Sequence, residues 1–142
     1  KLNPHNPFMG HRTDKQVPGC YASYGDWVME TLLMYMIPIM KAKTGLDLIP
    51  TYTYTRLYEK GNILKRHKDR PSCEVSTTIH LGGAEWPIFL DPSGATFVID
   101  ERKNIIKPGA PKGVQVDLKI GDMLIYAGCD LEHWREPFEG KV

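Results

Sequence analysis

The chain has 142 residues, of which 42% are hydrophobic and 25% charged, the composition of one ordinary globular domain. Eighteen basic residues against seventeen acidic ones leave a formal charge of +1, so no broad field attracts nucleic acid or an anionic membrane. The cysteines, Cys20, Cys73 and Cys129, form no CxxC pair and fit a reducing compartment such as the cytoplasm. No apolar run approaches the ~20 residues of a membrane span, so we expect no membrane partner. Nothing in the sequence indicates an oligomeric state.

The first element in chain order is an irregular arm over residues 1–25, which is rich in Pro, Gly, Asn and Ser without a sustained period. An amphipathic helix follows, because apolar residues recur at helical intervals from Trp27 to Met40. Asp26 can cap its first turn and Gly45 can end it. We expect the apolar stripe of this helix to face the core.

After the helix the period shortens toward two, and strand-like segments follow: "TYTYTRLY", "EVSTTIHL", "PIFLD", "ATFVID", "VQVDL" and "DMLIYAG". Turn signals such as Gly82-Gly83, "DPSG" and Gly121-Asp122 separate them. A helix followed by short strands at roughly 8–12-residue spacing is typical of a β-sandwich or jelly roll. We therefore expect a single domain over residues 1–142, mainly β with a supporting helix.

His67 and Asp69 lie two positions apart in "LKRHKDRPSCEVSTTIHLGG", directly before a predicted strand. Residues i and i+2 of an extended strand point to one face with their Cβ atoms roughly 6–7 Å apart, so both side chains can reach one ion. The motif is weak alone, because a hydrogen-bonded surface pair has the same spacing. His133, which follows a later strand and a Gly-Asp turn, is the third candidate ligand.

Two histidines and one carboxylate on one side of a metal form the facial triad of non-haem iron(II) oxygenases. The order His67-x-Asp69 followed much later by His133 is its usual arrangement. Zinc competes with iron, because three protein ligands plus water also describe a catalytic zinc site. The three residues are therefore predicted to be the metal ligands and the catalytic centre.

The segments "TYTYTRLYEKGNILKRHKD", "STTIHLGG" and "KIGDMLIYAGCDLEHWREPFEG" together resemble the iron(II)/2-oxoglutarate-dependent dioxygenases, nearest to the prolyl 4-hydroxylase-like group. The resemblance extends from about Thr51 to the last residue. It implies a double-stranded β-helix (jelly roll) that uses Fe(II), 2-oxoglutarate and O2, with ascorbate as a further candidate cofactor. The implied reaction hydroxylates a prolyl residue in a peptide or protein and converts 2-oxoglutarate to succinate and CO2.

The resemblance also assigns roles to residues of the first strand segment. It implies that the Tyr58 hydroxyl helps to bind 2-oxoglutarate, whereas the alternative is an ordinary strand aromatic packed on the core. Arg56 shares the strand face of Tyr58 by parity and is a second candidate for the cosubstrate, or else a solvated cation.

Beyond the distal histidine, the chain departs from the family, which usually places a Lys or Arg there to pair with the 2-oxoglutarate carboxylate. Lys141 has the right strand parity but comes about two residues early, and Arg135 is the alternative unless it pairs with a nearby glutamate. We expect that the chain shown stops before this basic residue and its strand, because a jelly roll lacking its last strand has an open edge. Arg70 and Trp134, beside the metal motifs, are candidate substrate contacts.

Two other functions stay open. One is a nucleic-acid demethylase of the same superfamily, since "RLYEKGNILKRHKD" also resembles that branch. The near-neutral charge and the lack of a basic aromatic platform count against a nucleic-acid partner. The other is a non-catalytic jelly-roll module that binds a structural metal, which an assay of succinate formation would distinguish.

Overall fold

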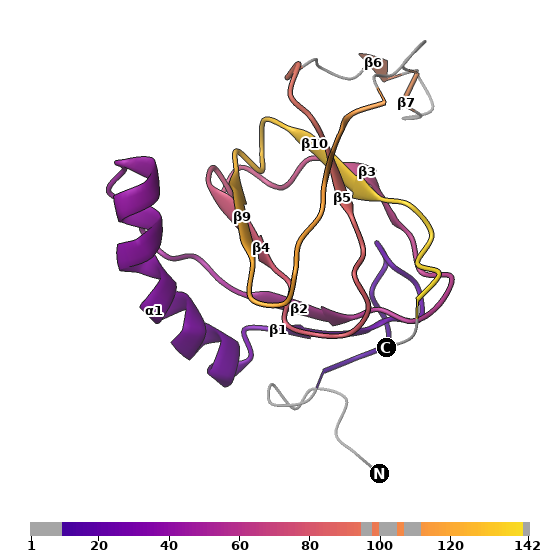
Figure 1. Cartoon of the computed structure of the whole chain (residues 1–142), viewed down its shortest axis with the longest axis horizontal. Helices are drawn as coiled ribbons and strands as arrows, with labels where there is room; N and C mark the ends of the chain where they lie inside the picture. The colour runs from indigo at the N-terminus through magenta and orange to yellow at the C-terminus, as the bar shows by residue number, and fades with distance from the viewer. Residues whose placement is uncertain (1–9, 95–97, 100–104, 107–111, 141–142) are drawn as a thin grey trace. The chain divides into compact units, whose positions relative to one another are not determined.

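The protein is mainly β with one α-helix in its described part (Figure 1). The computed structural model describes residues 10–94, 98–99, 105–106 and 112–140. The chain divides into two compact units, the first comprising Lys1–Leu64 with Pro137–Val142 and the second Lys65–Glu136. The single domain expected from the sequence stays a prediction.

Helix α1 (Trp27–Thr44) of the first unit begins and ends where the sequence predicts. Asp26 Oδ1 accepts hydrogen bonds from the backbone N–H groups of Val28 and Met29, which have no partner within the helix. Gly45 follows the last turn at φ 71°, a left-handed conformation that glycine adopts without a steric penalty. Both predicted ends of the helix are confirmed.

The apolar side chains of α1 are less buried than its pattern predicts. Met40 is buried, and Trp27 is 65% exposed. The other members of the predicted stripe are partly buried: Leu32, Leu33, Met36 and Ile37. The expectation of a core-facing stripe is therefore wrong at Trp27, because helical periodicity shows which residues share a face and not how much protein covers it. Among the described residues, no helix has both the length and the apolar content that a membrane span requires.

The first unit also contains a two-stranded antiparallel sheet. Strand β1 (Tyr21–Tyr24) pairs with β2 (Tyr54–Leu57), which lies inside one of the predicted strand segments. The expected irregular arm over residues 1–25 is therefore wrong for β1. The partner of β1 lies beyond α1 in the chain, so the local composition gave no sign of the pairing. A buried cluster of the same unit contains Val17, Cys20, Ala22 and Leu64.

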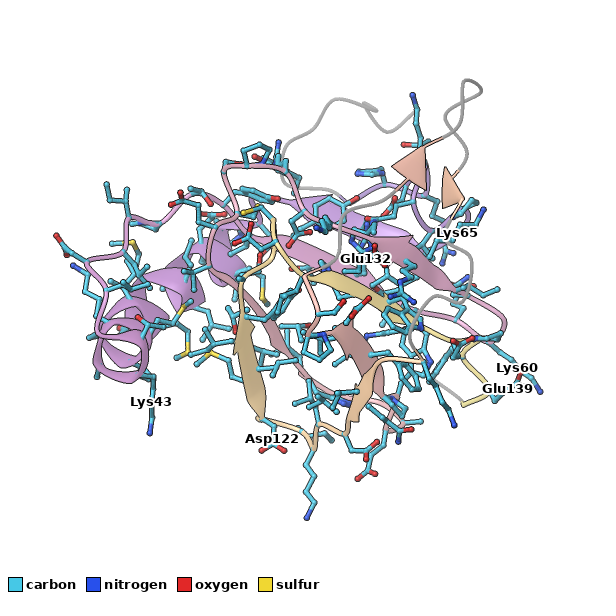
Figure 2. All side chains as sticks on the ribbon, turned by 90° about the horizontal axis from the view of Figure 1, so that it is seen from above. Lys43, Lys60, Lys65, Asp122, Glu132 and Glu139 are labelled. Carbon is cyan, nitrogen blue, oxygen red and sulfur yellow. The ribbon has the colours of Figure 1, made fainter. Side chains whose placement is uncertain are left out.

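The second unit is built from strands. A four-stranded sheet has the order β3 (Leu64–His67), β10 (Glu132–Arg135), β5 (Ile88–Asp91) and β8 (Val114–Val116). Two antiparallel pairs complete the described strands, β4 (Ser76–Ile79) with β9 (Met123–Tyr126) and β6 (Val98–Ile99) with β7 (Ile105–Ile106). The turn before β9 carries Asp122 at its tip (Figure 2), where its carboxylate accepts from the Lys119 N–H at 2.9 Å.

The predicted segments "EVSTTIHL", "PIFLD", "VQVDL" and "DMLIYAG" contain β4, β5, β8 and β9, so these strands are confirmed. The segment "ATFVID" contains β6 and otherwise lies outside the described residues. The sequence did not predict β3 or β10, because "LKRH" and "EHWR" carry charges where a strand signal needs apolar alternation.

The core of the second unit lies between β5 and β9. Ile88, Leu90 and Leu118 form its buried cluster, and partly buried apolar residues pack against them: Val116, Leu124, Tyr126 and Leu131. Because alternate residues of a strand share a face, β5 turns Ile88 and Leu90 toward this core and Phe89 away from it.

Cross-strand partners lie on the same face of a sheet, which places the residues of β10. His133 is opposite Leu90 and therefore faces the core, whereas Glu132 is opposite Asp91 on the other face. The sheet register thus turns one predicted ligand inward.

Candidate metal centre

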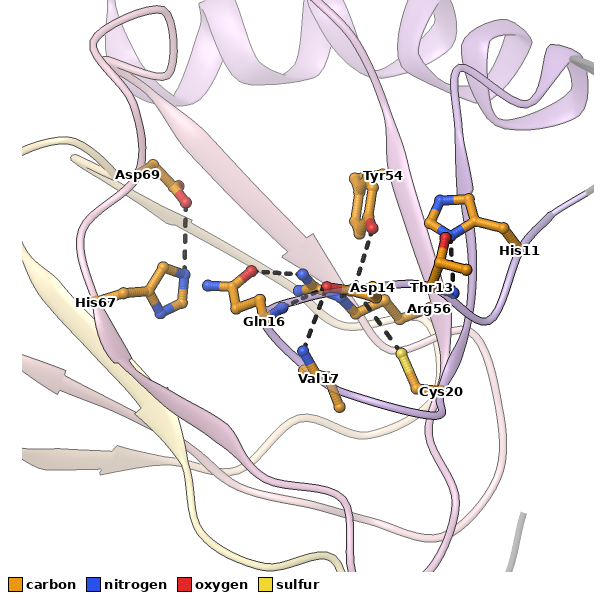
Figure 3. Close-up of polar contacts among 10 residues, drawn as sticks. All are labelled: His11, Thr13, Asp14, Gln16, Val17, Cys20, Tyr54, Arg56, His67 and Asp69. Carbon is orange, nitrogen blue, oxygen red and sulfur yellow. Dashed lines mark hydrogen bonds and ion pairs between the residues drawn. The ribbon is translucent and has the colours of Figure 1, made fainter. Parts of the chain in front are cut away.

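The three predicted ligands converge in the second unit. Their ligand atoms, one each from His67, Asp69 and His133, all lie within 4.8 Å of one another. His67 Nε2 lies 3.7 Å from Asp69 Oδ1, the contact drawn in Figure 3. His133 Nε2 lies 3.6 Å from the same oxygen. The two imidazole centroids are 4.2 Å apart.

Adjacent strands of one sheet supply the two imidazoles. His67 is the last residue of β3, and His133 lies in β10, the neighbour of β3. Asp69 follows β3, and its backbone N–H donates to the Gly128 carbonyl at 2.9 Å. The segment that leads into β10 therefore also holds the residue that carries the carboxylate.

Both histidines are oriented through their Nδ1 atoms. His67 Nδ1 lies 2.7 Å from the Lys65 carbonyl oxygen, and His133 Nδ1 lies 3.1 Å from that of Leu131. A carbonyl can only accept, so Nδ1 carries a proton, and Nε2 is the ring nitrogen that faces Asp69 and is left for a metal ion. Histidines that bind metals almost always donate their other ring N–H in this way, so the donor set fits a metal ion.

The Asp69 carboxylate is held in its ionised form. Ser76 Oγ donates to Asp69 Oδ2 at 2.6 Å, which leaves Oδ1 beside the imidazoles. Burial would raise the pKa of Asp69, but the hydrogen bonds from His133 and Ser76 and the charges of both histidines lower it. A deprotonated carboxylate is the form that binds a cation.

The centre is closed on the core side and partly open near the end of β3. The His133 side chain is 3% exposed, against 22% for His67 and 24% for Asp69. The Tyr126 ring of β9 packs edge-on against the His133 ring at a centroid distance of 4.8 Å. The exposed side of the centre is therefore the side of His67 and Asp69.

Sequence reasoning missed Ser76 and Gly128. A Cβ atom on Gly128 would lie 2.0 Å from Ser76 Oγ and 2.4 Å from Asp69 Oδ2, so any larger residue there would disturb the Ser76–Asp69 contact as it stands. A serine inside a strand segment and a glycine after one are common in any β protein, so neither gave a usable signal.

Comparison of the chain with family models, with curated proteins and with solved structures found no match. The candidate centre therefore rests on its own residues.

The two cosubstrate candidates of the first strand segment lie in the first unit. Tyr58 packs against the buried cluster of that unit. Arg56 Nε donates to Asp14 Oδ2 at 2.7 Å (Figure 3), and its side chain is 14% exposed, so the alternative of a solvated cation is wrong. Burial would lower the pKa of Arg56, but Tyr58 and Asp14 raise it. Binding of 2-oxoglutarate by these residues stays a prediction.

The remaining candidate residues do not all lie at the metal centre. Arg135 is buried and donates to the Trp86 carbonyl, with its guanidinium 5.0 Å from the Trp86 ring centroid. Trp134 lies on the face of β10 opposite His133, and Arg70 is exposed just after Asp69. Lys141 lies outside the described residues. Their cosubstrate and substrate roles stay predictions.

Proposed function

We propose that the protein is an Fe(II)/2-oxoglutarate-dependent dioxygenase that hydroxylates a prolyl residue in a peptide or protein. The observation that carries the proposal is the meeting of His67, Asp69 and His133, with both imidazole Nδ1 atoms bonded to carbonyl oxygens. Two histidines and a carboxylate that approach from one side leave further coordination positions open, which is the donor set of non-haem iron(II) oxygenases.

The proposal includes the jelly-roll fold and a reducing compartment, the cytoplasm. Antiparallel sheets and a core between β5 and β9 support the fold. All three cysteines are free thiols, which supports the compartment.

The residues of the chain would bind the metal ion, orient its ligands and exclude water from one side of the centre. His67 and His133 would offer Nε2, and Asp69 would offer Oδ1, while Ser76 holds the second carboxylate oxygen. Tyr126 and the apolar cluster exclude water from the His133 side. When bound, iron with 2-oxoglutarate and O2 supplies the oxidising chemistry, and 2-oxoglutarate leaves as succinate and CO2. The cosubstrate and the prolyl substrate are carried over from the sequence resemblance.

Succinate formation tests this proposal. With Fe(II), 2-oxoglutarate and O2, we expect the wild-type protein to form succinate, and faster when a proline-containing peptide is present. Asp69→Ala should lower the rate at least about 100-fold, since even partners of metal ligands cost 10–100-fold when they are removed. Asp117→Ala removes an exposed carboxylate of the same unit and should leave the rate unchanged.

Zinc binding is the outcome that distinguishes the competing function. The same three ligands with water make a catalytic zinc site. A wild-type protein that retains zinc and forms no succinate above the protein-free background would contradict the oxygenase proposal. Loss of a methyl group from methylated nucleic acid with release of formaldehyde, without hydroxylated peptide, would instead favour the demethylase branch.

A further inference from the structure

On the face of the four-stranded sheet opposite the metal centre, Arg66 binds two carboxylates. Its Nε donates to Glu132, and its Nη2 donates to Asp91 Oδ2 at 2.6 Å. The Arg66 side chain is 22% exposed, that of Asp91 is 2% exposed and that of Glu132 is 1% exposed. We refer to these three residues as the Arg66 cluster. It connects β3, β10 and β5, which are neighbours in the sheet.

Each strand that supplies an imidazole also supplies a member of the Arg66 cluster at the adjoining position. Arg66 precedes His67 in β3, and Glu132 precedes His133 in β10. Successive residues of a strand point to opposite faces, so the cluster and the metal centre share two strands but not a face. A slip of β3 against β10 by one residue would turn one imidazole to the wrong face.

Within the Arg66 cluster, the positive guanidinium offsets the repulsion between the two neighbouring carboxylates. Glu132 and Asp91 are direct cross-strand partners, and like charges in that position destabilise a sheet. The Arg66 guanidinium binds both carboxylates, and Ser93 donates to Asp91 Oδ1 from its N–H at 3.0 Å and from Oγ at 2.6 Å. Buried ion pairs add little net stability compared with apolar residues, but they can specify register.

The guanidinium of Arg66 is also fixed in orientation. Its central carbon lies 4.1 Å from the centroid of the Trp134 ring, and that ring stacks on Phe89 at 5.7 Å. A planar cation held on an aromatic face has little freedom to exchange its carboxylate partners.

We propose that Arg66, Asp91 and Glu132 are positioning residues that fix β3 against β10 and thereby set the separation of the His67 and His133 imidazoles. The inference rests on the proposed metal centre. The cluster touches neither imidazole and acts through the two strands.

Cobalt(II) alone is the probe for this inference, because its visible absorption depends on coordination geometry and its binding can be titrated. Arg66→Lys keeps the positive charge but replaces a planar fork with a point charge, which cannot bond both carboxylates in the same geometry. We expect at least tenfold weaker Co(II) binding and a changed spectrum at saturation, while the chain stays folded. Glu132→Gln, which removes one charge and keeps the shape, should act in the same direction.

Val17→Ala is the matched control, because it removes buried methyl groups from the apolar cluster of the first unit, outside both the Arg66 cluster and the metal centre. It should lower the Tm and leave the Co(II) affinity and spectrum unchanged, which separates positioning from stability. Wild-type affinity and spectrum in both cluster variants would overturn the positioning role alone. Failure of both variants to fold would make the cluster a folding requirement and would also overturn that role. A wild-type protein that binds no Co(II) would overturn the metal centre and the inference together.

Discussion

The Asp14 carboxylate is the hub of the polar contacts in the first unit (Figure 3). It accepts hydrogen bonds from the Gln16 N–H at 2.7 Å, the Tyr54 hydroxyl at 3.0 Å and Arg56 Nε at 2.7 Å. Burial would raise the pKa of Asp14, but these bonds lower it to about 2. Burial and the neighbouring Asp14 raise the pKa of Tyr54 to about 12. Asp14 is therefore ionised, with its charge compensated by Arg56, throughout the neutral range.

We expect Asp14→Asn to lower the free energy of unfolding by about 2–3 kcal/mol at pH 7. The pKa falls from 3.8 to about 2 on folding, and one pKa unit corresponds to about 1.4 kcal/mol. Because the folded-state pKa is the lower one, the wild type keeps this contribution above about pH 4 and loses it as the pH falls toward about 2. The difference between variant and wild type should shrink over that interval.

Urea unfolding measured from pH 2 to pH 7 tests this pH dependence. Asp47→Asn is the control, because Asp47 is an exposed carboxylate paired with Lys41 in the same unit, and it should change stability far less. A stability difference for Asp14→Asn that is constant with pH would contradict the role of the ionised carboxylate.

At the scale of elements, the segment between β9 and β10 positions the metal ligands. The Gly128 carbonyl accepts from the Asp69 N–H at 2.9 Å, and the Cys73 carbonyl accepts from the Cys129 N–H at 3.2 Å. These bonds join the segment after β3 to the segment before β10. The Asp69 carboxylate is therefore fixed relative to the His133 strand through the backbone.

Gly128→Ala tests the close packing of that segment. The added methyl group would lie 2.0 Å from Ser76 Oγ and 2.4 Å from Asp69 Oδ2, so the Ser76–Asp69 contact or the Gly128 backbone must shift. We expect metal affinity to fall about 10–100-fold, the range for disturbed partners of metal ligands. A Co(II) titration measures the effect, with Gly82→Ala as the control because its Cβ would meet nothing within 4 Å. Equal affinities of the Gly128→Ala protein and the wild type would show that Asp69 tolerates the shift.

A strand could be predicted from the sequence only where its residues show a clear apolar or β-branched pattern. β4, β5, β8 and β9 have apolar or β-branched runs that the sequence displays directly. β3 and β10 carry the imidazoles and the Arg66 cluster, and their charged residues obscure the alternation. The strands that build the candidate centre were therefore the ones that local patterns could not predict.

The candidate site was predictable to the same limited depth. The spacing of His67 and Asp69 and the later His133 indicated the ligands, although Asp69 lies just beyond the end of β3 and is held by its bond to the Gly128 carbonyl. Ser76, Gly128 and the Arg66 cluster depend on sheet register and on contacts between distant segments. The residue pattern of a single sequence does not reveal which residues of two strands lie opposite each other in a sheet.

At the scale of the molecule, the second unit contains the whole candidate centre. The ligands, the Ser76 and Gly128 contacts, the Tyr126 ring and the apolar cluster all lie within Lys65–Glu136. The described part of the chain is mainly β with one helix, as the helical periodicity before Gly45 and the alternating segments after it predict. The proposed reaction requires that this unit present an iron centre able to bind 2-oxoglutarate.

Anaerobic titration of the metal-free protein with Fe(II), followed by 2-oxoglutarate, tests that requirement most directly. We expect one Fe(II) per chain and a visible metal-to-ligand charge-transfer band that appears only when 2-oxoglutarate is added. Asp69→Ala should weaken or remove the band, and Asp117→Ala should retain it. A wild-type protein that shows no band with both additions, or that binds zinc tightly and excludes Fe(II), would contradict the account.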